Sequence, residues 1–94
     1  MDLIITLHPD RLSNPDLDIR YTLPDLLEEL SEGRLRSDGY DYTEDQALEL
    51  YLICEDGVTD PVELARQILV DRLVLGNDIL DAAEFRTEES VSRC

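Results

Sequence analysis

The chain has 94 residues, of which 43% are hydrophobic, and this fits one domain with a core of modest size. Twenty-three acidic residues face eight arginines and no lysine, which gives a formal net charge of −15. A chain this acidic repels nucleic acid and anionic membranes, so we expect direct contact with neither.

No apolar run approaches the ~18 residues of a transmembrane helix, and the first residues lack the positive start of a secretion signal. We therefore expect a cytoplasmic protein with a single domain over residues 1–94. Residues 1–87 are predicted to form the folded core, and residues 88–94 a loose tail.

The first third of the chain predicts a strand, a loop and a helix. Apolar and polar residues alternate over 3–7, which indicates a strand. Residues 9–21 have no helical period and are predicted to form a long loop. A helix is expected over 22–31, with Thr22 as its cap, Pro24 in its first turn and leucines along one side.

The rest of the chain predicts a hairpin, a second helix and a last strand. The hairpin joins strands at 34–43 and 47–55, and the second of these alternates most regularly. The second helix opens at Asp60, a good capping residue, and its apolar period continues to Leu75. An edge strand is expected over 82–87.

The order strand, helix, strand, strand, helix, strand predicts an α+β fold of the ferredoxin-like βαββαβ type. Right-handed crossovers place both helices on one face of an antiparallel four-stranded sheet. The other face of that sheet is then open. Phe85 is expected to point inward from the last strand.

Residues that could support catalysis are few. His8 is the single histidine and falls at the end of the first predicted strand. Cys54 belongs to the inward set of its strand and is predicted to be a buried free thiol, and Cys94 lies in the tail. The four glycines are not spaced to cradle a phosphate. We expect no catalytic residues and no cofactor.

A calcium-loop template is met only in part. Its acidic and amide positions would be filled by Asn14, Asp16, Asp18 and Asp25. The template needs glycine at its sixth position, where this chain has Ile19. We therefore expect no metal site.

The charge is concentrated in one part of the chain. Residues 37–65 contain nine acids and no basic residue: Asp38, Asp41, Glu44, Asp45, Glu49, Glu55, Asp56, Asp60 and Glu63. Such a field attracts positively charged proteins, so we expect a basic protein as the partner.

Tyrosines lie within this acidic stretch. Tyr40 and Tyr42 are expected on one face of the hairpin together with Tyr51. Tyrosines supply rigid contact area and carboxylates supply selectivity, so the predicted partner-binding residues are Asp38, Tyr40, Asp41, Tyr42, Glu44, Asp45, Glu49, Tyr51, Glu55 and Asp56. The alternative is that Tyr40 and Tyr42 lie against the core and the acids are merely solvated.

Small size, strong acidity and the stretches 21–27 and 38–42 resemble bacterial immunity proteins of polymorphic or contact-dependent toxin systems. This resemblance implies inhibition of a cognate toxin, frequently a basic nuclease, through protein–protein contact and without enzymatic activity. Two alternatives stay open. One is a DNA mimic that inhibits a DNA-binding or defence protein, and the other is a small enzyme or ligand-binding regulatory domain.

Overall fold

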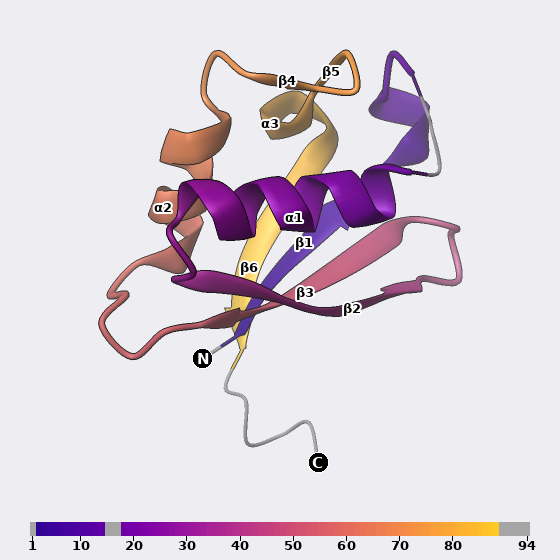
Figure 1. Cartoon of the computed structure of the whole chain (residues 1–94). Helices are drawn as coiled ribbons and strands as arrows, with labels where there is room; N and C mark the ends of the chain where they lie inside the picture. The colour runs from indigo at the N-terminus through magenta and orange to yellow at the C-terminus, as the bar shows by residue number, and fades with distance from the viewer. Residues whose placement is uncertain (1, 15–17, 89–94) are drawn as a thin grey trace.

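The computed structural model describes residues 2–14 and 18–88 (Figure 1). Its elements, in chain order, are β1 (Asp2–Leu7), the 3-10 turn η1 (Pro9–Arg11), α1 (Ile19–Leu30), β2 (Leu35–Tyr42), β3 (Leu48–Cys54), α2 (Pro61–Leu69), β4 (Leu73–Val74), β5 (Asn77–Asp78), α3 (Ile79–Ala82) and β6 (Ala83–Glu88). No helix in the described part of the chain is long and apolar enough to cross a membrane.

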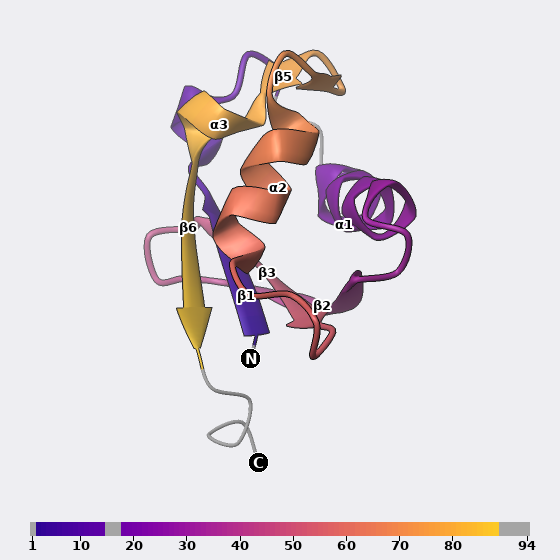
Figure 2. The ribbon, with the colours of Figure 1, turned by 90° about the vertical axis from the view of Figure 1, so that its left-hand side faces the viewer.

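The predicted four-stranded antiparallel sheet is confirmed. Its strand order is β2-β3-β1-β6, and every neighbouring pair is antiparallel. On one face, Leu3, Ile5 and Leu7 of β1 lie opposite the inward leucines of β3. These side chains form one buried cluster with residues of α1 and α2. Both helices therefore cover the same face of the sheet (Figure 2).

Within the described residues, the opposite face of the sheet carries no helix, yet its centre is not exposed. Ile4 points to this open face and is only 1% exposed. Its neighbours in register are Tyr51 on β3 and Arg86 on β6, two long side chains. Long side chains can shield an apolar neighbour while their polar ends stay in water, and we attribute the burial of Ile4 to them.

The first helix starts earlier than the sequence predicts. It begins at Ile19, not at Thr22, and Pro24 lies inside it. Ile19 is buried and extends the inward stripe of Leu23 and Leu27 by one turn, which explains the earlier start. The predicted loop at 9–21 is accordingly shorter and contains η1, and Asp16 lies outside the described residues.

The second helix ends earlier than the sequence predicts. It stops at Leu69, and Leu73 and Leu75, the apolar residues that suggested a continuation, lie in the small hairpin of β4 and β5. Leu75 and Gly76 both have positive φ, as a tight two-residue turn between strands requires. The buried Asn77 side chain ties this hairpin to Asn14 through bonds of 2.7 and 2.8 Å. The expectation of two helices therefore misses α3.

Other local predictions are confirmed. The Asp60 carboxylate accepts a hydrogen bond of 3.1 Å from the Glu63 amide and caps α2. Phe85 lies opposite Ile5 on the covered face, and Cys54 is a buried free cysteine. Glu88, which we placed in the tail, is the last residue of β6 because it pairs with Asp2. The rest of the predicted tail, 89–94, lies outside the described residues.

One irregularity in β2 decides where its side chains point. Ser37 pairs with Leu52 and Tyr40 with Leu50, so β2 holds one extra residue over this step. Gly39 lies in this step with φ of +101°, a value that favours glycine. Side chains alternate along a strand, so the extra residue moves Tyr40 and Tyr42 to the covered face.

We predict that Gly39→Ala lowers the free energy of unfolding by about 1–2 kcal/mol, because a Cβ is strained at this positive φ. The space around Gly39 is open, so a steric clash contributes nothing. Gly57→Ala is the matched control, since its surroundings are equally open and its φ lies outside the left-handed region. Urea unfolding measures both, and equal stability of the two variants would contradict a strained bulge.

Candidate functional site

Three exposed tyrosines meet where the first turn of α1 approaches the edge strand β2. The ring centroids of Tyr21 and Tyr40 are 6.0 Å apart, and those of Tyr40 and Tyr42 are also 6.0 Å apart. Both pairs are edge-to-face, with interplanar angles of 88° and 82°. This geometry is the favourable one for aromatic rings. We call these three residues with Arg20 the tyrosine cluster.

Arg20 holds the cluster together. Its guanidinium carbon lies 4.7 Å from the centre of the Tyr21 ring and 5.8 Å from that of Tyr40. A hydrogen bond from Arg20 lowers the pKa of Tyr21, and a further hydrogen bond from Tyr40 acts in the same direction. The pKa of Tyr40 is raised because its hydroxyl bonds to Tyr21. Tyr21 thus accepts from both neighbours, which restricts the rotamers of all three side chains.

The cluster remains open to solvent. Tyr21, Tyr40 and Tyr42 are 52%, 39% and 48% exposed. The alternative, in which Tyr40 and Tyr42 lie against the core, is therefore half right. Both side chains point to the covered face, but both remain exposed. Exposed aromatic side chains held in contact with one another form a surface suited to binding another protein.

The backbone edge beside the cluster is largely closed. The outward amide of Leu35 donates to Ser31 Oγ at 2.9 Å, and that of Ser37 donates to Glu28 Oε1 at 3.2 Å. The amide of Tyr42 donates to Asp41 Oδ1 at 2.8 Å. These side-chain acceptors occupy the donors that an added strand would need. A partner at this edge must therefore be bound mainly by side chains.

The expectation that Tyr51 shares a face with Tyr40 and Tyr42 is wrong. The bulge at Gly39 turns the two β2 tyrosines to the covered face, whereas Tyr51 points to the open face. There its hydroxyl donates to Glu49 Oε1 at 3.0 Å. The ten predicted binding residues thus do not form one continuous surface.

The predicted acids divide among several places. Asp38 and Asp41 lie on exposed β2 close to the tyrosine cluster. Glu44 and Asp45 occupy the turn before β3, and Glu55 and Asp56 follow its last residue, so these two pairs lie at opposite ends of the hairpin. Glu49 lies on the open face. Of the predicted acids, only Asp38 and Asp41 therefore lie on the same strand as Tyr40 and Tyr42, and the Asp41 carboxylate accepts a hydrogen bond from the Tyr42 amide.

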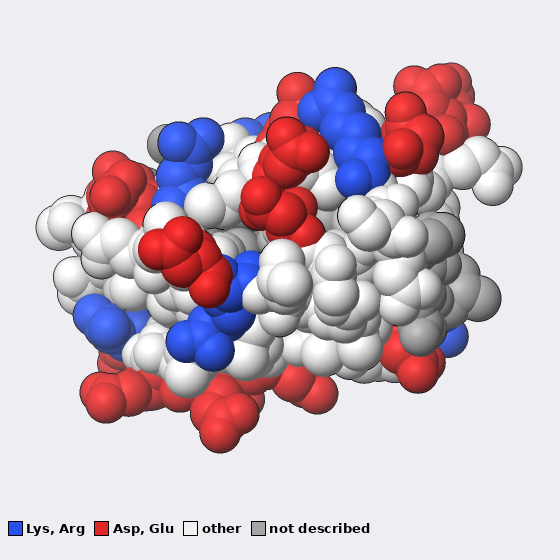
Figure 3. Space-filling model, turned by 90° about the horizontal axis from the view of Figure 1, so that it is seen from above, with Lys and Arg blue, Asp and Glu red and all other residues white. Residues whose placement is uncertain are grey.

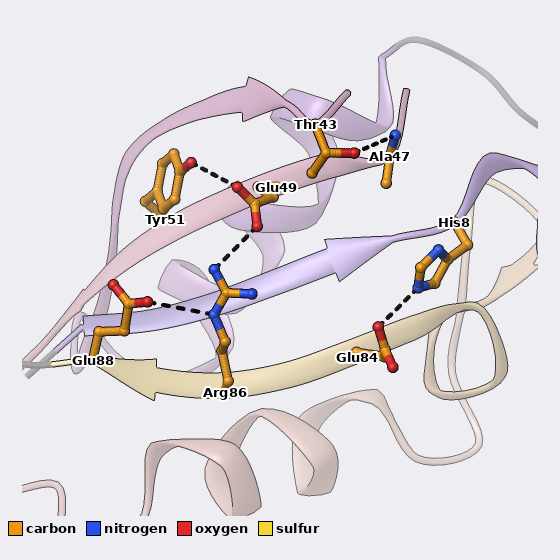
Figure 4. Close-up of polar contacts among 8 residues, drawn as sticks. All are labelled: His8, Thr43, Ala47, Glu49, Tyr51, Glu84, Arg86 and Glu88. Atoms are coloured by element: carbon orange, nitrogen blue, oxygen red, sulfur yellow. Dashed lines mark hydrogen bonds and ion pairs between the residues drawn. The ribbon is translucent and has the colours of Figure 1, made fainter. Parts of the chain in front are cut away.

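An arginine from a distant part of the chain enters this acidic region. Arg86 of β6 reaches across β1 and bonds Glu49 Oε2 at 3.1 Å, and it lies 3.6 Å from Glu88 Oε1 (Figure 4). Glu49 is therefore neutralised and only 18% of its side chain is exposed. At the end of the molecule with β4, β5 and α3, arginines and carboxylates lie interspersed (Figure 3).

A hollow of about 580 Å³ lies on the open face near the β2–β3 turn. His8 lines it and pairs with Glu84 Oε2 at 3.0 Å, as Figure 4 shows. Of the predicted binding residues, only Asp45 and Glu49 reach this hollow. His8 thus has a local partner but does not lie beside Cys54, which is buried on the covered face and whose pKa is raised by burial.

Sequence reasoning missed Arg20 and Tyr21 as members of the site. The prediction assigned both to a loop, so their position on the first turn of a helix was not foreseen. A signal was available, because Ile19 extends the spacing of Leu23 and Leu27 backward by four residues. That spacing places Tyr21 on the outer side of the helix.

Among the described residues, no group of three or more His, Cys, Asp or Glu side chains could hold a metal ion. Comparison with protein-family models, curated proteins and solved structures gives no match for this chain.

We predict that Arg20→Ala raises the pKa of Tyr21 toward the ordinary tyrosine value of 10.0, because the variant loses the donor that stabilises the tyrosinate. In an alkaline titration followed by tyrosinate absorbance, the first ionisation then moves to higher pH. Arg11→Ala, which removes an arginine of η1, is the control and leaves the curve unchanged. An unshifted first ionisation in Arg20→Ala would show that Arg20 does not bond to Tyr21.

Proposed function

We propose that this chain is a binding protein that neutralises a basic protein partner, and that it acts as an immunity protein against a cognate toxin, a nuclease being the prime candidate. The observation that carries the proposal is the tyrosine cluster, three exposed and mutually contacting tyrosines beside Asp38 and Asp41.

The tyrosines supply the anchoring energy in this proposal. Tyrosine and arginine are enriched among the interface residues that dominate binding. The contacts within the cluster already restrict Tyr21, Tyr40 and Tyr42 before a partner arrives. Less side-chain entropy is then lost on binding, which favours affinity.

The carboxylates supply attraction at long range. With a net charge of −15, the chain attracts a basic partner, and such steering raises association rates to ~10⁸–10⁹ M⁻¹s⁻¹ at low salt. A nuclease binds phosphates with positive charge, so an acidic inhibitor is complementary to its cleft. Rapid capture suits a protein whose partner is harmful when free.

The composition of the cluster favours this proposal over a DNA mimic. A mimic of the phosphate backbone needs carboxylates that are not interrupted by positive charge, whereas Arg20 lies between Tyr21 and Tyr40. A guanidinium among tyrosines is typical of a protein–protein anchor. The DNA mimic remains an outcome that the binding experiment below distinguishes.

A ligand-binding role is favoured by a different observation, the hollow lined by His8. Its volume of about 580 Å³ lies within the ~300–1,000 Å³ typical of small-molecule sites. His8 and Arg86, the two basic side chains of its lining, are already paired with Glu84 and Glu49. We therefore rank this role second.

We also propose that the fold is a ferredoxin-like variant. Support comes from the strand order, in which β1 and β3 are central and β2 and β6 are the edges, and from the two longer helices on one face. The β4–β5 hairpin and α3 then form an insertion before the last strand.

The proposed function is tested with the product of the gene adjacent to the one for this chain. We expect that product to be a basic protein that stops growth when it is expressed alone and is harmless when this chain is present. Tyr21→Ala and Tyr40→Ala each raise the dissociation constant by about 30-fold, chiefly through faster dissociation, since a truncated anchor typically costs about 2 kcal/mol. Tyr51→Ala, on the open face, is the matched control with little effect.

Charge reversal of Asp41, Glu44 and Asp45 to lysine gives the second arm of the same experiment. This variant associates more slowly and its association depends less on salt, because steering is weakened. If only the charge variant lost binding while both alanine variants kept it, a DNA mimic would explain the data better. If the neighbouring protein is harmless or is not inhibited, the immunity proposal fails.

A further inference from the structure

The edge strand β6 exposes backbone groups that β1 does not use. The amide of His8 donates to the Ala82 carbonyl at 2.9 Å, so His8 and Ala82 form a hydrogen-bonded pair. Hydrogen-bonded and non-hydrogen-bonded pairs then alternate along the antiparallel β1–β6 ladder. Glu84, Arg86 and Glu88 bond to β1, and the backbone groups of Phe85 and Thr87 point away from it. β6 is the outermost strand beside α2 (Figure 2).

The two edges of the sheet differ in how their donors are occupied. On β2, side-chain oxygens accept hydrogen bonds from the outward amides of Leu35, Ser37 and Tyr42. On β6, no side chain of the described residues accepts a hydrogen bond from the amide of Phe85 or Thr87. An edge with unused donors and acceptors is a template for another strand.

The sequence of β6 is complementary to itself in one register. If two copies pair antiparallel about a twofold axis at Phe85, then Arg86 of each lies opposite Glu84 of the other. Moving the axis by one residue places Glu84 opposite Glu84, or Arg86 opposite Arg86. Like charges directly opposite are destabilising, so the register at Phe85 is selected.

The backbone alternation agrees with this register. Phe85 would pair with Phe85 of the second copy, and Thr87 with Ala83, through the outward groups that β1 leaves unused. Glu84 and Arg86 then form non-hydrogen-bonded pairs, in which cross-strand side chains approach most closely. Both are accessible, with 72% and 52% of their side chains exposed.

The layer above β6 adds apolar contact area. On α2, the Arg66 guanidinium carbon lies 5.9 Å from the centre of the Phe85 ring. Arg66, Val70 and Leu80 line a common hollow of about 310 Å³, and Val70 is 54% exposed although it is apolar. A second copy joined at β6 would approach this side of α2.

We propose that two copies of this chain associate through β6, antiparallel about a twofold axis at Phe85, and form one continuous eight-stranded sheet. The tyrosine clusters then lie at the two outer β2 edges, so each remains free for a partner. Because each copy carries a charge of −15, the dimer is weakest at low salt and strengthens as salt screens the repulsion.

Sedimentation of the full chain at increasing concentration and salt tests the proposal. We expect a dimer at high concentration, and a dissociation constant that falls as salt rises. Thr87→Pro removes one outward donor from each copy while keeping the ladder to β1, and it raises the dissociation constant by about tenfold or more. Thr87→Ala keeps the amide and is the matched control.

A charge exchange tests the register independently of proline. Arg86→Glu alone weakens the dimer, and the double variant Glu84→Arg with Arg86→Glu restores it, although both changes disrupt pairs within the chain. Circular dichroism checks that each variant is folded. A wild-type chain that stays monomeric at all concentrations overturns the proposal. A dimer that persists in Thr87→Pro, or that the double exchange does not restore, also overturns it.

Discussion

One extra residue in β2 determines what this protein can present to a partner. Without the bulge at Gly39, Tyr40 and Tyr42 would alternate onto the open face, beside Tyr51 and far from α1. With the bulge, they reach Tyr21 and Arg20 in the first turn of α1. The tyrosine cluster therefore depends on a backbone conformation that favours glycine, and not on the chemistry of the tyrosines alone.

The two faces of the sheet differ in their chemistry as a result. The open face pairs its polar side chains with one another, with Arg86 bound to Glu49 and His8 to Glu84. The corner between α1 and β2 instead exposes aromatic surface, with Arg20 among the rings and acids beside it. A carboxylate that is already paired with a cation of the same chain contributes less to the long-range attraction of a basic partner. The asymmetry is why our proposal places the partner at the tyrosine cluster and not on the open face.

Local signals in the sequence predicted much of the fold. Asp60 caps its helix, and the regular alternation through β3 correctly predicts which of its side chains point to the core. Features that depend on tertiary packing were missed. The apolar period that continued to Leu75 belongs to a separate hairpin. Residues 37–65 contain no arginine, yet Arg86 bonds to Glu49 within them, because β6 lies next to β1 in the sheet. The bulge was missed because a glycine in a strand does not reveal its φ.

Proton–proton contacts between the tyrosine rings test the central claim most directly. Nuclear Overhauser spectra of the folded protein should show cross-peaks from the Tyr40 ring to those of Tyr21 and Tyr42, whose centroids are each 6.0 Å away, and none to Tyr51. Cross-peaks between Tyr40 and Tyr51, with none to Tyr21, would mean that β2 pairs without the bulge. That result would contradict the tyrosine cluster and the proposal that rests on it.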